Sequence, residues 1–342
     1  MEHQVPFRRW TPAAAVIFLI LGFLGGCGTF VRDTMIVIIK VNSEFSAKDI
    51  EIEIDRSFIE KYEDRVDITA TFTVDKAMQN PNARLMDGDL HMAGRAPEVA
   101  LPVVAEIANA ASVKDATALV HRVEGTARPL RVSGVWRIWA EHAGRAKEEQ
   151  GEPQEPATSY NPGHVFEIHP VTRLDDIDLR GTFRPIGGGF EPGDAHDTFG
   201  IYQNVECTIS VRPEAVSIIT RKGVFNNVEF LMEIVEDRQI EVPGGRFVIA
   251  SAWDLKGNLL VKRLRMVFAD GTPPERTVKR LKRGDRLRVY GLPRIDLSEI
   301  SRRVRVSRTD PAALTLPLPY EIIIQGVYEG PGSSEGRDGT CL

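Results

Sequence analysis

The sequence has little of what several specialised protein classes need. Its 342 residues include only three cysteines, and aromatic side chains make up 7% of them. A disulfide scaffold is therefore excluded, because so few cysteines cannot cross-link a chain of this length into a stable fold. No apolar run approaches the roughly 20 residues of a membrane-spanning helix, which excludes a polytopic membrane protein. The 29 glycines and 21 prolines indicate many turns and exclude a coiled coil.

Motifs of nucleophilic and cofactor-dependent enzymes are missing too. The chain has no Gly-x-Ser-x-Gly elbow, Walker loop, His-Glu-x-x-His, Cys-x-x-Cys pair or dinucleotide fingerprint. Nothing therefore supports nucleophilic catalysis. With 42% hydrophobic residues the chain can still form hydrophobic cores, and its length is sufficient for two domains.

The first 26 residues are typical of a secretory signal. Arg8 and Arg9 precede an apolar run over 13–24, and Gly25-Gly26-Cys27 follows. This end resembles the bacterial lipobox, which implies cleavage before Cys27 and attachment of a lipid to its thiol. Gly28, where an aspartate would resemble the inner-membrane retention signal, implies an outer-membrane lipoprotein facing the periplasm. An uncleaved signal anchor with a chance cysteine is the alternative.

The remaining chain has the period-two alternation of strands and no long helices. We predict strands over 35–41, 49–55, 66–74, 85–92, 99–109, 130–141, 164–174, 228–236, 246–253, 259–268, 286–292 and 320–328. Ser112 and Asp115 resemble a capping box that opens a helix running to Val123. Five strands with a helix between the third and fourth are typical of the OB-fold. The predicted fold class is therefore mostly β, with two small OB-like β-barrel domains after a lipoprotein signal peptide.

Composition sets the expected domain limits. These are a signal peptide (1–26), an anchor and tether (27–48), an OB-like domain (49–184), a basic OB-like domain (198–329) and a disordered tail (330–342). The charged stretch 144–163 is predicted to be a surface loop, and the Gly- and Pro-rich stretch 185–197 the domain boundary. No internal repeat is plain, although a Val-x-Gly strand occurs at 132–134 and again at 289–291.

Carboxylate and imidazole side chains recur with strand spacing in the first domain. The candidate metal ligands are Asp87, Asp89, His91, Glu106, Glu167 and His169. On a strand, residues two apart project from one face. If these strands are neighbours, their side chains converge on a site suited to a divalent metal ion. His142 and His164 are outer candidates. The alternative is that these groups only hydrogen-bond one another.

Four sequence blocks in this region resemble an uncharacterised bacterial family. They are Asp87–His91 (Asp-x-Asp-x-His), Ala105–Ile107, Leu130–Val135 and Glu167–Val171 (Glu-Ile-His-Pro-Val). The resemblance implies an OB-like domain and supplies no catalytic assignment. A weaker likeness is to staphylococcal-type nucleases, which would make Asp87 and Asp89 metal carboxylates. The chain departs from that pattern, since it lacks a downstream Val-Asp-x-Pro-Glu block and an evident pair of phosphate-clamping arginines.

The second domain carries a strongly basic stretch. Residues 262–308 contain 15 Lys/Arg against 5 Asp/Glu. The candidate ligand-binding residues are Arg263, Arg265, Lys282, Arg283, Arg286 and Arg288. The segment 281–291 resembles a strand of nucleic-acid-binding OB domains. Outside the cytosol, nucleic acid is not expected, and anionic lipid headgroups, lipopolysaccharide phosphates or acidic wall polymers are the expected partners. The alternative is a solvated face that pairs with the acidic first domain.

These observations favour a lipid-anchored cell-envelope protein that binds an anionic ligand without catalysis, with the membrane as partner through its anchor. A metal-dependent phosphodiesterase or nuclease is one alternative, and a structural envelope component is another. The sequence establishes no cofactor, and a divalent metal ion is the one candidate. It leaves open the ligand, the oligomeric state and whether Cys207 and Cys341 pair.

Overall fold

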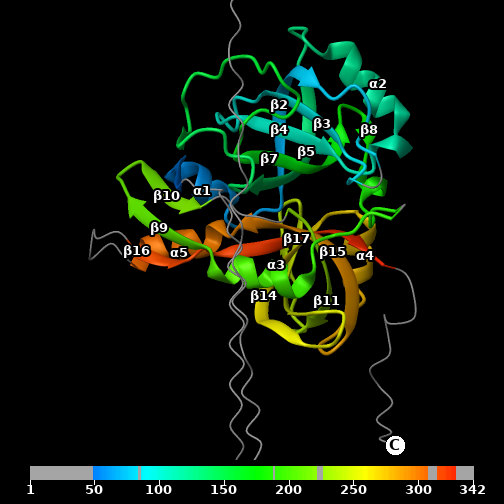
Figure 1. The fold of residues 1–342 in the computed structure, drawn as a ribbon, viewed down its shortest axis with the longest axis vertical. Coiled ribbons are helices and arrows are strands. Elements are labelled where there is room, and N and C mark those ends of the chain that lie inside the picture. The colour runs from blue at the N-terminus through cyan, green and yellow to red at the C-terminus, as the bar shows by residue number, and fades with distance from the viewer. Residues whose placement is uncertain (1–48, 84–85, 188, 222–225, 307–313, 329–342) are drawn as a thin grey trace, which may run out of the picture. The chain divides into compact units, whose positions relative to one another are not determined.

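The computed structural model describes residues 49–83, 86–187, 189–221, 226–306 and 314–328. Cys27, the signal peptide, the tether, the strand predicted over 35–41, the tail and Cys341 lie outside these residues. The described part contains two closed five-stranded barrels and a third sheet (Figure 1). None of its helices has the length and hydropathy to cross a membrane.

Barrel 1 closes in the order β2-β3-β4-β7-β5. Its strands are β2 (Asp67–Ala77), β3 (Leu90–Arg95), β4 (Val103–Ile107), β5 (Leu130–Ile138) and β7 (Phe166–Leu174). The β4–β7 pairing is parallel and the others are antiparallel. Helix α2 (Lys114–Val123) joins the third and fourth strands, and the short β8 (Ile177–Asp178) extends β7.

Barrel 2 repeats this arrangement as β11-β13-β14-β17-β15. Its strands are β11 (Val228–Ile234), β13 (Gly245–Trp253), β14 (Leu259–Ala269), β15 (Arg286–Ile295) and β17 (Tyr320–Val327). Helix α4 (Pro273–Val278) again lies between the third and fourth strands, and β12 (Ile240–Val242) pairs with β13. Strand order and helix position are those of the OB-fold. The predicted fold class, mostly β with two OB-like barrels, is confirmed.

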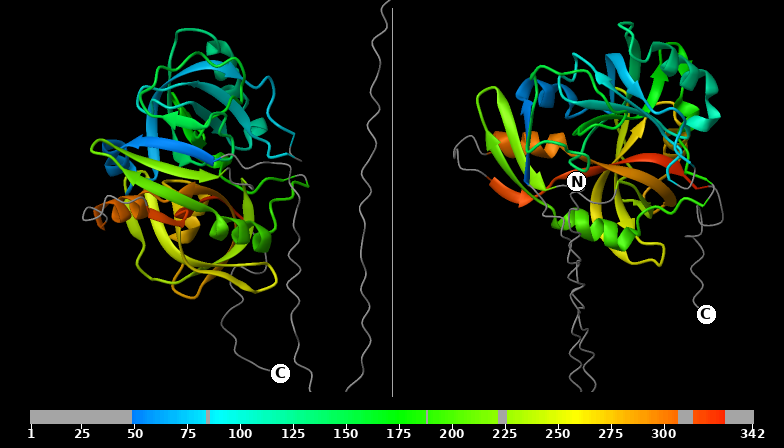
Figure 2. Two further views of the ribbon diagram at one scale, coloured as in Figure 1. Left: turned by 60° about the vertical axis from the view of Figure 1, so that its left-hand side comes forward. Right: turned by 45° about the horizontal axis from the view of Figure 1, so that its top comes forward.

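A third sheet draws its strands from separate parts of the chain, in the order β16-β9-β10-β1-β6. They are β16 (Leu314–Pro317), β9 (Glu206–Val211), β10 (Ala215–Arg221), β1 (Asp49–Asp55) and β6 (Lys147–Glu149). We call it the shared sheet, because β6 is inserted between two strands of barrel 1 and β16 between two of barrel 2. Both views in Figure 2 show the yellow-green β9–β10 hairpin beside the blue β1. Helices α1 (Arg56–Tyr62), α3 (Ala195–Asn204) and α5 (Leu297–Val306) complete the described elements.

Three local predictions were wrong. The strand predicted over 85–92 begins only at Leu90, as β3. The stretch 144–163 is not a loop throughout, because β6 pairs in parallel with β1 and its Glu148 side chain is only 1% exposed. Composition missed this strand since its partner lies almost a hundred residues earlier. The capping box at Ser112 does not form either: the N-cap of α2 is Val113, and the Ser112 hydroxyl donates to the Asn109 carbonyl instead.

The barrels carry an internal repeat on their fourth and fifth strands. The fourth strands read Val-Ser-Gly-Val-Trp-Arg-Ile over 132–138 and Val-Tyr-Gly-Leu-Pro-Arg-Ile over 289–295. Arg137 pairs with Glu167 on the fifth strand of barrel 1, and Arg294 pairs with Glu321 at the same register in barrel 2. The glycine is required at both sites. A Cβ at Gly134 would lie 2.7 Å from a backbone oxygen of β7, and one at Gly291 would lie 2.8 Å from a backbone oxygen of β17.

The repeated arginines join the two barrels reciprocally. Arg137 Nε donates to the Pro293 carbonyl at 2.8 Å, and Arg294 Nη1 donates to the Trp136 carbonyl at 2.9 Å. Each arginine thus bonds the residue that precedes its counterpart, which is the pattern of a self-complementary twofold contact. The Arg294 guanidinium also lies 3.6 Å from the centre of the Trp136 ring, within cation–π distance.

Candidate functional site

The candidate metal ligands of barrel 1 lie on its outer wall. Along β7, Phe166 and Ile168 belong to the hydrophobic core, so the intervening Glu167 and His169 face outward. The β3–β4 register places His91 opposite Glu106 on the same face. Despite this outward position, these side chains are buried.

His169 lies at the centre of the group. Its Nε2 is 3.2 Å from Asp89 Oδ2, and its Nδ1 is 3.1 Å from Glu106 Oε2 and 3.3 Å from Glu167 Oε2. His91 Nε2 is 3.5 Å from the same Glu106 oxygen. We call Asp89, His91, Glu106, Glu167 and His169 the barrel 1 cluster; its members are 2–7% exposed.

Asp87 lies apart from the cluster. β3 begins only at Leu90, so Asp87 falls in the turn before it and does not share the strand spacing. Its Oδ1 accepts hydrogen bonds from the Asp89 amide and from Asn82 Nδ2. The carboxylate of Asp87 thus shapes the turn that presents Asp89.

The far side of Glu167 is held by residues that sequence reasoning did not select. The buried Arg137 donates from Nη1 to Glu167, and its Nη2 lies 3.8 Å from Glu141. Of the outer candidates, His164 Nε2 lies 3.2 Å from Glu167 Oε1, and His142 stacks on His164 with ring centres 5.2 Å apart. The recurring Val-x-Gly-x-x-Arg pattern was the available signal for Arg137.

Burial and the charges of neighbouring groups shift the pKa values of these side chains in opposite directions. Burial raises the pKa of Asp89 to about 6 and that of Glu141 to about 7. Burial alone would lower the pKa of His169, but the surrounding carboxylates, Glu106 foremost, raise it well above its usual value. Against its own burial, Glu167 has a pKa held well below the usual range by Arg137 and the two adjacent histidines.

Barrel 2 has apolar side chains at the corresponding places. Strand registers equate His91 with Phe247, Glu106 with Val267 and His169 with Ile323. All three apolar residues are buried, in a small cluster that includes Val66 and Val135 from the other barrel. The Arg–Glu pair is therefore common to both barrels, whereas the imidazole and carboxylate groups around it are particular to barrel 1.

The predicted basic residues are placed on several elements, and most have carboxylate partners. Arg263 pairs with Glu236, Arg286 with Glu233 and Arg288 with Glu229. Two of these glutamates lie on β11, directly across from β15. Arg265 is mostly buried and bonds Glu321 and Asp296. Lys282 and Arg283 lie in the turn before β15, where their amides donate to Asp285 and Asp237.

A groove of about 540 Å³ crosses barrel 2 beside two of these arginines. It is bounded by α3, β14, α5 and the segment Leu316–Tyr320, and we call it the barrel 2 groove. Arg263 and Arg303 line it with 59% and 43% of their side chains exposed. Leu264, the prolines of the segment and two tyrosines supply apolar wall, while Asp296 and Glu299 also line the groove, so it combines apolar surface with charges of both signs.

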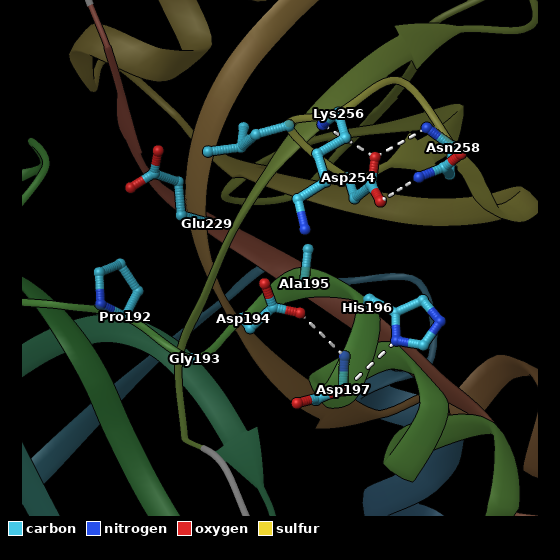
Figure 3. A pocket seen from close by; sticks show the side chains of 11 residues that line it. Pro192, Gly193, Asp194, Ala195, His196, Asp197, Glu229, Asp254, Lys256 and Asn258 are labelled. Carbon is cyan, nitrogen blue, oxygen red and sulfur yellow. Dashed lines mark hydrogen bonds and ion pairs between the residues drawn. The ribbon is translucent and has the colours of Figure 1, made fainter. Parts of the chain in front are cut away.

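A second pocket, of about 730 Å³, opens between the start of α3 and the β13–β14 turn (Figure 3). Its carboxylates have local partners. Asp194 caps α3 by accepting from the Asp197 amide, and Asp254 accepts from both the amide and the side chain of Asn258. Glu229 pairs with Arg288. These bonds account for the acidic lining without a ligand.

No protein-family model matches the chain, and no curated protein matches it either. Among solved structures, it is similar to a deletion mutant of the single-stranded DNA binding protein from Thermus aquaticus. That similarity has a TM-score of 0.22 at 12% identity, covering 80% of this chain and 97% of that chain. At this level it adds no argument, so the OB assignment rests on strand order and pairing.

Proposed function

We propose that the protein is a non-catalytic binding module, held at the cell envelope by a lipid on Cys27, that takes an anionic ligand in the barrel 2 groove. The observation that carries the proposal is the position of this groove. OB-folds bind extended ligands on the face of their second and third strands and at the loop between strands four and five. The groove lies on the third strand, β14, and against the elements inserted between the fourth and fifth strands, α5 and β16.

The groove residues suit a ligand with both charge and apolar surface. Arg263 and Arg303 are exposed enough to exchange their glutamate partners for phosphate or carboxylate groups of a ligand. Exposed ion pairs of this kind contribute only about 0–1 kcal/mol, so exchanging the partner costs little. The expected ligands are the anionic lipid headgroups or acidic polymers of a bacterial envelope.

Catalysis is not favoured, because the barrel 1 cluster is out of reach of a substrate. Each of its five side chains is at most 10% exposed. A phosphodiesterase needs its metal ligands open to at least one substrate oxygen. The same burial is compatible with the remaining alternative, a structural envelope component, which the following experiment separates from ligand binding.

The test is titration of the full chain, in neutral detergent, with polyphosphate and with short-chain phosphatidylglycerol. The double variant Arg263→Glu/Arg303→Glu should bind at least about tenfold more weakly, because charge-assisted bonds contribute about 1.5–3 kcal/mol each. The salt dependence should also fall, since each lost phosphate contact removes roughly 0.7 from the log–log slope. The matched control is Arg286→Glu/Arg288→Glu, outside the groove, which should bind as the wild type does. If both variants lose affinity equally, or if the wild type does not bind, the structural alternative is favoured instead.

The anchor has its own test. Cys27→Ala should abolish incorporation of radiolabelled fatty acid, because the thiol is the attachment point that the lipobox resemblance implies. Label that persists in this variant would contradict the lipoprotein proposal.

A further inference from the structure

We propose that the barrel 1 cluster binds one divalent transition-metal ion of the zinc class, through Asp89, Glu106 and His169 with His91 beside them. This inference is independent of the barrel 2 groove. One ligand atom from each of the first three residues lies within 4.8 Å of the other two. His169 meets a carboxylate at each ring nitrogen. Nε2, beside Asp89, can therefore bind the ion while Glu167, 3.3 Å from Nδ1, orients the ring, as is usual for histidine ligands of metals.

Unpartnered nitrogen atoms in the cluster support the assignment. His91 is 93% buried, and among the described residues neither of its ring nitrogens has a hydrogen-bond partner. His169 Nε2 lies close to Asp89 but likewise makes no well-oriented hydrogen bond. Buried polar atoms without partners are costly and uncommon in folded proteins. A metal ion would supply the missing partner.

Barrel 2 shows that the fold does not need polar groups at these positions. Phe247, Val267 and Ile323 fill the equivalent places and are buried there. Buried charged groups rarely stabilise a fold more than well-packed apolar residues of similar volume do. The imidazoles and carboxylates of barrel 1 are therefore better explained by a ligand than by the requirements of the barrel.

The donor set selects the class of metal. Imidazole with carboxylate suits zinc and its first-row neighbours, whereas calcium and magnesium prefer shells made of oxygen alone. The adjacent trio of Glu106, His164 and Glu167 is less suitable as a metal site, because the Arg137 guanidinium already donates a hydrogen bond to the Glu167 carboxylate. This places the ion on the Asp89 side of the cluster.

The first experiment measures the metal content and thermal unfolding of the full chain, purified in detergent, stripped with chelator and dialysed against zinc, manganese or calcium. We expect about one zinc ion per chain and a higher unfolding temperature with zinc than with calcium, since a ligand of the folded state alone stabilises it. Asp89→Asn/His169→Gln should lose both effects. The matched control is His196→Gln/Asp197→Asn, in the exposed trio at the start of α3, which should retain both.

A second variant separates metal loss from misfolding. His91→Phe, Glu106→Val and His169→Ile copy barrel 2 into barrel 1, with Asp89→Asn to remove the remaining proposed carboxylate ligand. This variant should unfold cooperatively, at least as stably as the metal-free wild type, and should bind no zinc. The proposal is overturned if the wild type neither binds zinc nor is stabilised by it, or if the variant that copies barrel 2 still binds zinc. Binding of short-chain phosphatidylglycerol in the groove should be the same for the metal-free chain and for the zinc-loaded chain after unbound zinc is removed, so the two proposals fail separately.

Discussion

The two barrels share a scaffold and differ in what surrounds one ion pair. In both, an arginine on the fourth strand meets a glutamate on the fifth, and each arginine reaches across to the other barrel's backbone. In barrel 2 a second arginine, Arg265, also bonds that glutamate. In barrel 1 the neighbours are histidines instead. The shared pair therefore forms part of the contact between the barrels, and the neighbours of that pair are what differs between them.

The difference also changes how each site balances charge. In barrel 2, Arg265 and Arg294 face Glu321 and Asp296. The carboxylates raise the pKa of Arg265 against its burial, and burial lowers the pKa of Arg294 only to about 10, so both arginines stay charged near neutrality. Barrel 1 sets a single arginine among several carboxylates and relies on imidazoles for the remaining positive charge. The barrel 1 site should therefore respond to pH between about 5 and 8, because the pKa of Asp89 is raised to about 6 and that of Glu141 to about 7.

The largest expected effect comes from removing either shared arginine. Arg137→Met and Arg294→Met should each lower the free energy of unfolding by about 3–5 kcal/mol, because each leaves a buried glutamate without its main partner. The Arg137→Met loss should be smaller at pH 5 than at pH 8, because Glu167 loses the guanidinium that holds its pKa down and is then more readily neutralised by a proton at the lower pH. The Arg294→Met loss should be the same at both values, because Arg265 does not titrate there. Urea unfolding at the two pH values measures both. Equal pH dependence in the two variants would contradict the contrast drawn between the barrels.

A smaller effect, of opposite sign in the two barrels, is expected at two glutamates. Burial raises the pKa of Glu141 to about 7. Between the pKa of this carboxyl in the unfolded chain and pH 7, the folded state therefore keeps a proton that the unfolded chain has released. The wild type should then lose stability as the pH rises through this range, by at most about 3 kcal/mol. Glu141→Gln should remove that loss and be the more stable protein at pH 8.

Glu275 in barrel 2 is the matched case. Lys279 and Arg246 outweigh its burial and lower its pKa. Its ionised form therefore stabilises the fold above the unfolded pKa, and that stability is lost as the pH falls through the folded pKa. Glu275→Gln should accordingly destabilise the protein at neutral pH. Thermal unfolding of both variants from pH 4 to pH 8 checks the signs, and parallel curves for the two would show that the barrels do not differ in this way.

The sequence was most informative where structure is local. Alternating strands such as β2 and β14 could be predicted because the period-two pattern is written in consecutive residues. The shared sheet could not, since β6 and β16 are short and their partners lie far away in the chain. Asp89, Glu106 and His169 could be brought together only by assuming the strand neighbours of an OB barrel, and the assumption failed to place Asp87 because β3 starts later than its alternation suggested.

Counting charge along one segment hid the partners of the basic residues. The window 262–308 is strongly basic, yet Glu229 and Glu233 lie outside it, four residues apart on the same face of β11. Pairing of β11 with β15 then sets opposite charges side by side. Arg137 and Arg294 escaped notice for a related reason, because a charged residue in a strand is ordinarily read as exposed.

The shared sheet has a consequence for how the protein completes its folding. Strand β1 precedes barrel 1 and pairs with β10, which follows it, so that Ser217 bonds Glu51 from 166 residues away. Their pairing closes a loop of chain that contains the whole of barrel 1. Closing so long a loop costs little more free energy than closing a short one, but contacts this distant in sequence form slowly. Until they form, β1 offers an open edge to other chains. We therefore expect the first strand of the described chain to pair late in folding.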